Sequence, residues 1–310
     1  MSLDRKIDIH HHICPPAYVK GLAGKHPIFP ILLDWTPERS IEDMDRAGVE
    51  TAIVSISTPG LWFGDDDAAR RLARLCNEYG AGLVARYRRR FGFFAALPLP
   101  DVEGSLREVE HALDVLKADG ICLYTSYGDK YLGDPAFRPV LEELNRRRAV
   151  IYTHPTINPC CVNIVPVVSE AIIEYGTDTT RAIASLLFSG AAARCRDARF
   201  IFSHAGGTMP FLFARFQQQV RNNFARGKGP PDVLQDIARF FYDTAQSCHA
   251  APMAALRQIV AVSQIVFGTD FPWGKAQEHV ERLADCDFNP DDIAAIMRNN
   301  ALQLVPRLRS

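Results

Sequence analysis

The chain of 310 residues is 47% hydrophobic and 23% charged, which excludes a mainly disordered or collagen-like protein and is ordinary for a folded globule. Its formal net charge is -1 and its isoelectric point is about 6.8, so no field of one sign exists that would attract nucleic acid or an anionic membrane. We therefore expect a small-molecule partner, with no nucleic acid and no membrane. Since there is neither a signal-peptide-like apolar segment nor a run of about 18 apolar residues, we expect a cytoplasmic protein.

Short apolar runs typical of buried strands alternate with amphipathic stretches along the whole chain, which predicts a parallel sheet. The expected strands are 6–12, 50–57, 91–97, 120–125, 149–154, 199–204, 240–244 and 264–269. No linker rich in Pro, Gly or Ser interrupts this alternation. The pattern predicts that residues 1–310 form a single α/β domain, a distorted (β/α)8 TIM barrel.

The helices between the strands carry their own signals. Thr36 and Pro37 are suited to the N-cap and first position of a helix that ends at Gly48. Apolar residues recur at helical spacing over 102–116 and again over 137–144, which indicates core-facing helices. Two segments, 13–35 and 155–190, are too long for minimal barrel loops, and we expect a helix within the second.

The strongest local signal is the segment DIHHH at the end of the first strand. Alternate residues of a strand face the same side, so His10 and His12 can both point into the mouth of the barrel while His11 points elsewhere. Imidazole nitrogen is a common ligand of zinc and similar divalent ions, but two ligands from one strand need partners from elsewhere in the chain.

Three further expected strand ends carry suitable groups. His154 ends the fifth strand, His204 ends the sixth in the segment HAGG, and Asp270 ends the eighth in the segment GTDFP. The carboxyl ends of barrel strands lie on the face where barrel enzymes keep their active sites. Each residue alone would be unremarkable as a structural histidine or a capping aspartate, but their shared position indicates one site.

These motifs resemble the amidohydrolase superfamily, in particular its branch of nonoxidative decarboxylases similar to aminocarboxymuconate-semialdehyde decarboxylase and the resorcylate decarboxylases. Within that branch, segments such as 44–49, 90–98 and 127–134 look most like members assigned to 6-methylsalicylate decarboxylation. The resemblance implies one divalent metal bound by His10, His12, His154 and Asp270, and it implies that His204 handles a proton. It also implies a homodimer.

Two differences between this sequence and members of the superfamily narrow what the resemblance implies. Binuclear members bridge two metals with a lysine or an acidic residue near the end of the fourth strand, whereas segment 120–125 has neither, which favours a mononuclear site; bridging by Cys122 is less favoured than core packing. No arginine lies between Cys14 and Glu38, where the semialdehyde decarboxylases carry one for a substrate carboxylate. Aromatic residues of the loops suit a ring instead of a second carboxylate: Phe29, Trp62, Phe63, Phe271 and Trp273.

We therefore expect a metal-dependent carboxy-lyase that decarboxylates a small aromatic hydroxy acid such as 6-methylsalicylate, with His204 and Asp270 as catalytic residues. Zinc or manganese is the expected metal, since three histidines and a carboxylate suit several divalent ions. Asp243, Glu38 and Arg215 are candidates for contacts behind the ligands, although surface ion pairing suits Arg215 better.

Two alternatives fit the same residues. In a mononuclear hydrolase of an amide, lactone or ester, the metal would activate water and Asp270 or His204 would act as the base. A non-catalytic metal-binding barrel is the second alternative, and the histidine of the HAGG segment argues against it.

Overall fold

The computed structural model describes residues 5–226 and 233–309. Its main sheet has eight strands in chain order, and each strand is parallel to its neighbours. The strands are β1 Lys6–Ile13, β2 Val49–Ile56, β3 Phe91–Ala96, β4 Gly120–Tyr124, β7 Val150–His154, β8 Arg199–Phe202, β9 Phe241–Asp243 and β10 Ile265–Val266. A small antiparallel pair, β5 Ser126–Tyr127 and β6 Lys130–Tyr131, lies in the loop after β4.

The sheet closes between its first and last strands. The Ile9 amide donates to the Phe267 carbonyl at 2.9 Å, and His11 forms a parallel bridge with Phe271. The prediction of a (β/α)8 barrel is therefore confirmed. β10 is shorter than predicted because its pairing with β9 stops at Val266. The Phe267 amide donates to the Ile296 carbonyl at 3.0 Å, and the Gly268 amide donates to the Thr244 hydroxyl at 3.1 Å.

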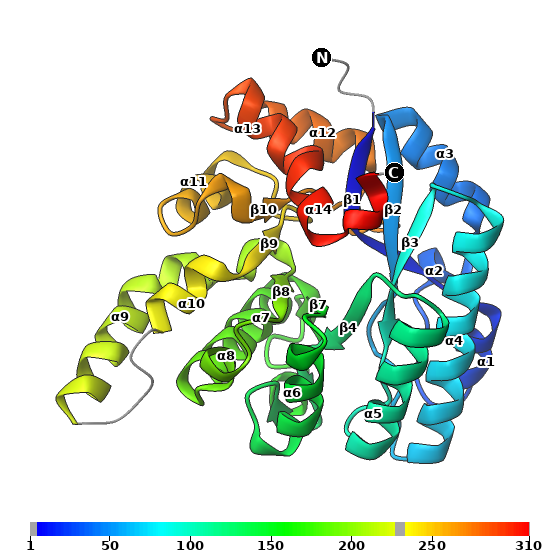
Figure 1. The fold of residues 1–310 in the computed structure, drawn as a ribbon, viewed down its shortest axis with the longest axis horizontal. Helices are drawn as coiled ribbons and strands as arrows, with labels where there is room; N and C mark the ends of the chain where they lie inside the picture. The colour runs from blue at the N-terminus through cyan, green and yellow to red at the C-terminus, as the bar shows by residue number, and fades with distance from the viewer. Residues whose placement is uncertain (1–4, 227–232, 310) are drawn as a thin grey trace.

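Helices surround the strands, as Figure 1 shows. The α-helices are α1 Pro16–Leu22, α2 Pro30–Leu33, α3 Pro37–Ala47, α4 Asp66–Arg86, α5 Val102–Glu110, α6 Arg138–Arg146, α7 Glu170–Phe188, α8 Ala191–Arg194, α9 Met209–Ala225, α10 Val233–Arg239, α11 Ala250–Arg257, α12 Ala276–Ala284, α13 Pro290–Ala294 and α14 Asn300–Leu304. Two π-helical turns, His111–Val115 and Ala295–Asn299, continue α5 and α13. Short 3-10 turns are Pro135–Phe137, Pro159–Cys161, His204–Gly206, Val262–Gln264 and Pro306–Arg309.

The local helix signals in the sequence correspond to observed contacts. The Thr36 side chain accepts a hydrogen bond from the Arg39 amide at the start of α3, and Gly48 ends that helix with a left-handed φ of 68°. The long segment 155–190 contains α7, as expected. Since α7 packs against the His204–Gly206 turn that follows β8, this segment lies beside the candidate site.

The hydrophobic core has two parts. One lies inside the barrel and includes Ile9, Phe94 and Tyr152, and the larger part lies between the strands and the helices. Cys122 is fully buried within the inner part, in agreement with a packing role. Among the described residues, no helix is both long and apolar enough to cross a membrane.

Candidate metal centre

The barrel brings four of the predicted residues to one point. His10 and His12 come from β1, His154 is the last residue of β7, and Asp270 follows β10. All four are buried, and one potential ligand atom from each lies within 4.8 Å of the others. This group could hold a metal ion.

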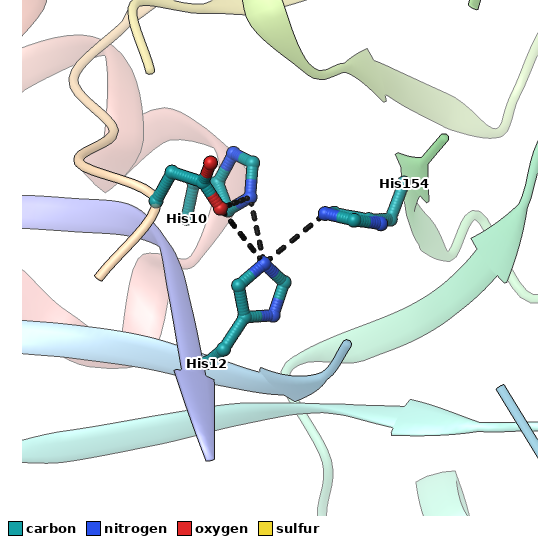
Figure 2. A group of neighbouring side chains, drawn as sticks. His10, His12 and His154 are labelled. Carbon is teal, nitrogen blue, oxygen red and sulfur yellow. Dashed lines mark hydrogen bonds and ion pairs between the residues drawn. The ribbon is translucent and has the colours of Figure 1, made fainter. Parts of the chain in front are cut away.

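The ring nitrogens of the cluster approach one another closely. His12 Nε2 lies 3.0 Å from His10 Nε2 and 3.1 Å from His154 Nε2, as Figure 2 shows. Asp270 Oδ1 lies 3.1 Å from both His10 Nε2 and His12 Nε2. A proton on any one of these nitrogens can serve only one of the neighbouring lone pairs, whereas a cation between them would serve all four groups.

Neighbouring acceptors fix two of the rings in the orientation that metal binding requires. His10 Nδ1 lies 2.9 Å from Asp243 Oδ2, and His154 Nδ1 lies 2.8 Å from the Pro155 carbonyl oxygen. Because both partners only accept, each Nδ1 carries a proton and donates it, so each Nε2 is the ring nitrogen that faces the cluster and is left to bind a metal. The donor set therefore fits a divalent ion.

The electrostatics of the cluster favour a positive charge. Burial opposes the charged form of His10, but Asp243 and Asp270 outweigh it and raise the pKa of His10 to about 10. Burial would raise the pKa of Asp270, yet contacts with His10, His12 and His204 hold this pKa well below its ordinary value. Burial also lowers the pKa of His12 and, to a larger extent, that of His154. Two neutral imidazoles beside buried carboxylates form an environment that attracts a cation.

His204 lies beside the cluster but at its edge. Its Nε2 is 3.5 Å from Asp270 Oδ2, and its main-chain amide donates to Asp243 Oδ1 at 2.8 Å. His204 and Ala205 have left-handed φ values of 53° and 55°, and Asp270 shares that conformation. Such strained positions in non-glycine residues are typical of functional sites, where surrounding contacts enforce them. Asp243 therefore orients both His10 and the backbone of His204.

A cavity of about 680 Å³ opens onto this group and is lined by His154, His204 and Asp270. Its aromatic lining consists of Phe29, Trp273 and Tyr175. The volume is in the range of small-molecule sites, about 300–1,000 Å³. We name it the metal cavity.

The other sequence candidates have different positions. Trp62 lines a neighbouring cavity, Phe63 packs against the core, and Phe271 stacks on His11 with ring centroids 4.5 Å apart, so neither Phe63 nor Phe271 forms the expected wall of the metal cavity. Glu38 accepts a hydrogen bond from the Tyr87 hydroxyl on the outer surface, so its proposed contact behind the ligands is wrong.

Arg215 is exposed on α9, away from the cluster of this chain. Tyr175 and Thr58 also line the metal cavity, although neither was expected there from the sequence. Neither residue belongs to a recognisable motif, and only the length of segment 155–190 pointed to the region of Tyr175.

Comparison with known proteins places this geometry in context. The family model described as Amidohydrolase matches residues 7–307. The 6-methylsalicylic acid decarboxylase acuB of Aspergillus aculeatus is 36% identical, and the alignment covers 98% of this chain and 97% of the relative.

Solved structures agree on the fold. A crystal structure of an amidohydrolase II is 26% identical, with a TM-score of 0.89 over 97% of this chain and 99% of the other. A dihydroxybenzoic acid decarboxylase from Polaromonas, solved with bound manganese and the inhibitor 2-nitroresorcinol, is 23% identical, with a TM-score of 0.85 over 99% of this chain and 98% of the other.

Proposed function

The chain belongs to the amidohydrolase family, and from that premise we propose that it is a metal-dependent carboxy-lyase that decarboxylates a small hydroxybenzoate such as 6-methylsalicylate. The observation that carries the proposal is the convergence of three imidazole nitrogens and a carboxylate on a cavity of ring size. The 36% identity to a 6-methylsalicylic acid decarboxylase along nearly the whole chain supports the choice of reaction.

We assign the metal ligands as His10, His12, His154 and Asp270, with zinc or manganese as the ion. The manganese in the Polaromonas structure supports this choice. When bound, the ion would neutralise the charge of the substrate carboxylate and of its neighbouring phenol oxygen. Asp243 and the Pro155 carbonyl act as positioning groups because they keep the Nε2 lone pairs of His10 and His154 directed at the ion.

His204 and Asp270 are assigned to proton transfer. His204 Nε2 is buried and lies 3.5 Å from Asp270 Oδ2, and His204 lines the metal cavity. An imidazole in this position can deliver a proton to the ring carbon that bears the carboxylate. The bond between that carbon and the carboxylate then breaks, its electron pair restores the aromatic ring, and carbon dioxide leaves; the consumed proton is replaced from solvent.

The cavity favours a ring with a single carboxylate. Among the described residues that line the metal cavity there is no lysine and no arginine. These residues therefore offer no fixed cation that could pair with a second carboxylate of the substrate. Phe29 and Trp273 instead contact each other edge to face, with centroids 6.0 Å apart, and offer an apolar wall. An uncharged ring substituent is therefore preferred.

The test is to incubate metal-replete protein with 6-methylsalicylate and a panel of hydroxybenzoates, and to follow phenols by chromatography and carbon dioxide by trapping. We expect release of both in equal amounts, dependent on added metal. Hydrolysis of a lactone, ester or amide without any carbon dioxide would favour the hydrolase alternative. Metal binding without turnover of any compound would favour a non-catalytic barrel.

We also propose that residues 1–310 form one domain and that the protein is a cytoplasmic homodimer. Support for self-association comes from apolar side chains exposed on α7 and α9, with Ile172 76% and Phe211 69% exposed. Sedimentation analysis would show a mass of twice 34.5 kDa if the proposed dimer forms.

A further inference from the structure

A second cavity of about 540 Å³ lies beside the metal cavity. The two cavities share three lining residues, Phe29, Thr58 and Tyr175. They are therefore adjacent spaces. We name the second space the side chamber.

Tyr175 of α7 stands at the boundary. It lines both cavities, as does Thr58, which lies just after β2, so the two residues form part of the boundary. The Tyr175 ring centroid lies 6.2 Å from that of His154, and the Tyr124 ring, which lines the side chamber, lies 6.4 Å from the same histidine. One proposed metal ligand is thus flanked by the boundary residue and by the wall of the side chamber.

The wall of the side chamber is mainly apolar, although His26, Ser126 and Thr156 also line it. Leu61, Trp62, Ile157 and Val162 contribute carbon surface. The Tyr124 hydroxyl is not free, because it already contacts the carbonyls of β2 and its following residue at 3.1 and 2.8 Å. Its remaining surface is the face and edge of the ring.

Among the described residues, the ionisable side chains that line the side chamber include one carboxylate, Glu170, and the imidazole of His26. Glu170 accepts a hydrogen bond from the Asn163 amide at 3.1 Å, and among the described lining residues there is no lysine or arginine. Such a wall disfavours an anionic group and favours hydrocarbon, which gains free energy on leaving water.

We infer that the side chamber binds an alkyl chain of several carbons carried by the ring of a hydroxybenzoate whose carboxylate lies at the metal cluster. This inference rests on the proposed function and extends its substrate class from methyl-substituted to long-chain alkyl hydroxybenzoates. The alkyl chain passes Tyr175 and Thr58, and these two side chains move apart or turn to admit it. A chamber of this size has room for the alkyl chain, since small-molecule cavities of about 300–1,000 Å³ hold entire ligands.

The first experiment compares kcat/KM for 6-methylsalicylate with that for the four isomers 3-, 4-, 5- and 6-pentylsalicylate. We expect at least one pentyl isomer to reach a value within about tenfold of the methyl compound or above it, since each methylene buried in an apolar pocket favours binding. If all four are poorer by more than about tenfold while 6-methylsalicylate is decarboxylated, the inference is wrong and the proposed function stands. If no salicylate is decarboxylated, the proposed function itself fails.

Matched variants test whether the alkyl chain lies in the side chamber. Val162 lines the side chamber, whereas Val167 lies in the same loop, is 93% exposed and lines neither cavity. In Val162→Trp, the ratio of kcat/KM for the best pentyl isomer to that for the methyl compound should fall by at least about tenfold, because the indole fills the chamber. In Val167→Trp the ratio should stay at the wild-type value.

Ile157→Trp repeats the test from another part of the wall, in case one variant folds poorly. Thermal unfolding of each variant shows whether it is folded. An unchanged ratio in the folded variants of Val162 and Ile157, or an equal fall in the Val167 variant, would overturn the inference.

Discussion

Replacing Asp243 with asparagine tests how the protein prepares its metal ligands. Asp243 Oδ1 accepts the amides of His204 and Ala245 at 2.8 and 3.0 Å, and Oδ2 accepts the Nδ1 proton of His10 at 2.9 Å. In Asp243→Asn the carbonyl oxygen must remain with the two amides, because an amide nitrogen cannot accept them. The amide NH2 then faces His10 and donates to Nδ1, so that the His10 proton moves to Nε2.

A protonated Nε2 cannot bind a metal. In the variant, the hydrogen bond from the amide NH2 to His10 Nδ1 must therefore break before the metal binds. We expect the dissociation constant for zinc or manganese to rise by about 10- to 100-fold, the usual effect of removing a partner behind a metal ligand. At about 1.4 kcal/mol per tenfold change, this corresponds to a loss of about 1.4–2.8 kcal/mol of binding free energy. Competition with a fluorescent chelator measures the constant directly.

The matched control is Asp236→Asn, a buried aspartate of α10 that bonds Arg239 at 2.6 Å and does not contact the cluster. This variant should keep the wild-type metal affinity even if its stability falls. Activity of Asp243→Asn should partly recover at saturating metal. Wild-type affinity in Asp243→Asn would refute the reasoning that the carboxylate sets the His10 tautomer.

Three further predictions concern the proton, the metal and the surface. His204→Asn should lower kcat by about 10²–10⁴-fold at unchanged metal content, and unchanged turnover would remove its assigned role. Chelation should abolish activity and lower the melting temperature, with both restored by zinc or manganese, because a ligand of the folded state alone stabilises that state; an unchanged melting temperature would contradict metal binding at a folded site. Arg146, and then Arg147, lower the pKa of Glu143 to about 2 against the effect of burial. The stability from Glu143 is therefore present above its ordinary pKa of 4.5 and is lost as the pH falls towards 2. Glu143→Gln should cost about 1 kcal/mol in urea unfolding at neutral pH, and the difference from wild type should shrink in acid; a difference independent of pH would refute this assignment.

The strand ends could be predicted because the chemistry there follows a simple periodicity. β1 places His10 and His12 on one side by alternation, and β7 ends at His154 after a run of apolar residues. All strands of a parallel barrel deliver their carboxyl ends to one face, so the meeting of these residues followed from the element order alone. By the same alternation, His11 points to the other side of β1, where it forms hydrogen bonds with Asp8 and Ser40.

Other features depend on contacts between distant segments and leave no local pattern. The bond between His10 and Asp243 spans 233 positions of the chain, and its role appears only when both side chains are placed. β10 ends at Val266 because the next two amides bond the Ile296 carbonyl and the Thr244 side chain and not the β9 backbone. Thr58 follows β2 and Tyr175 lies on α7, and the two come together only at the cavities that both of them line.

The most direct test of the central claim follows the proton. Decarboxylation of 6-methylsalicylate by the metal-replete protein in deuterium oxide should give 3-methylphenol with one deuterium at the ring carbon between the hydroxyl and methyl groups, where the carboxylate was attached. Proton NMR should then show loss of that ring signal alone, together with one carbon dioxide per phenol and no reaction in metal-free protein. Absence of the phenol with metal bound, or the same product without metal, would contradict the account.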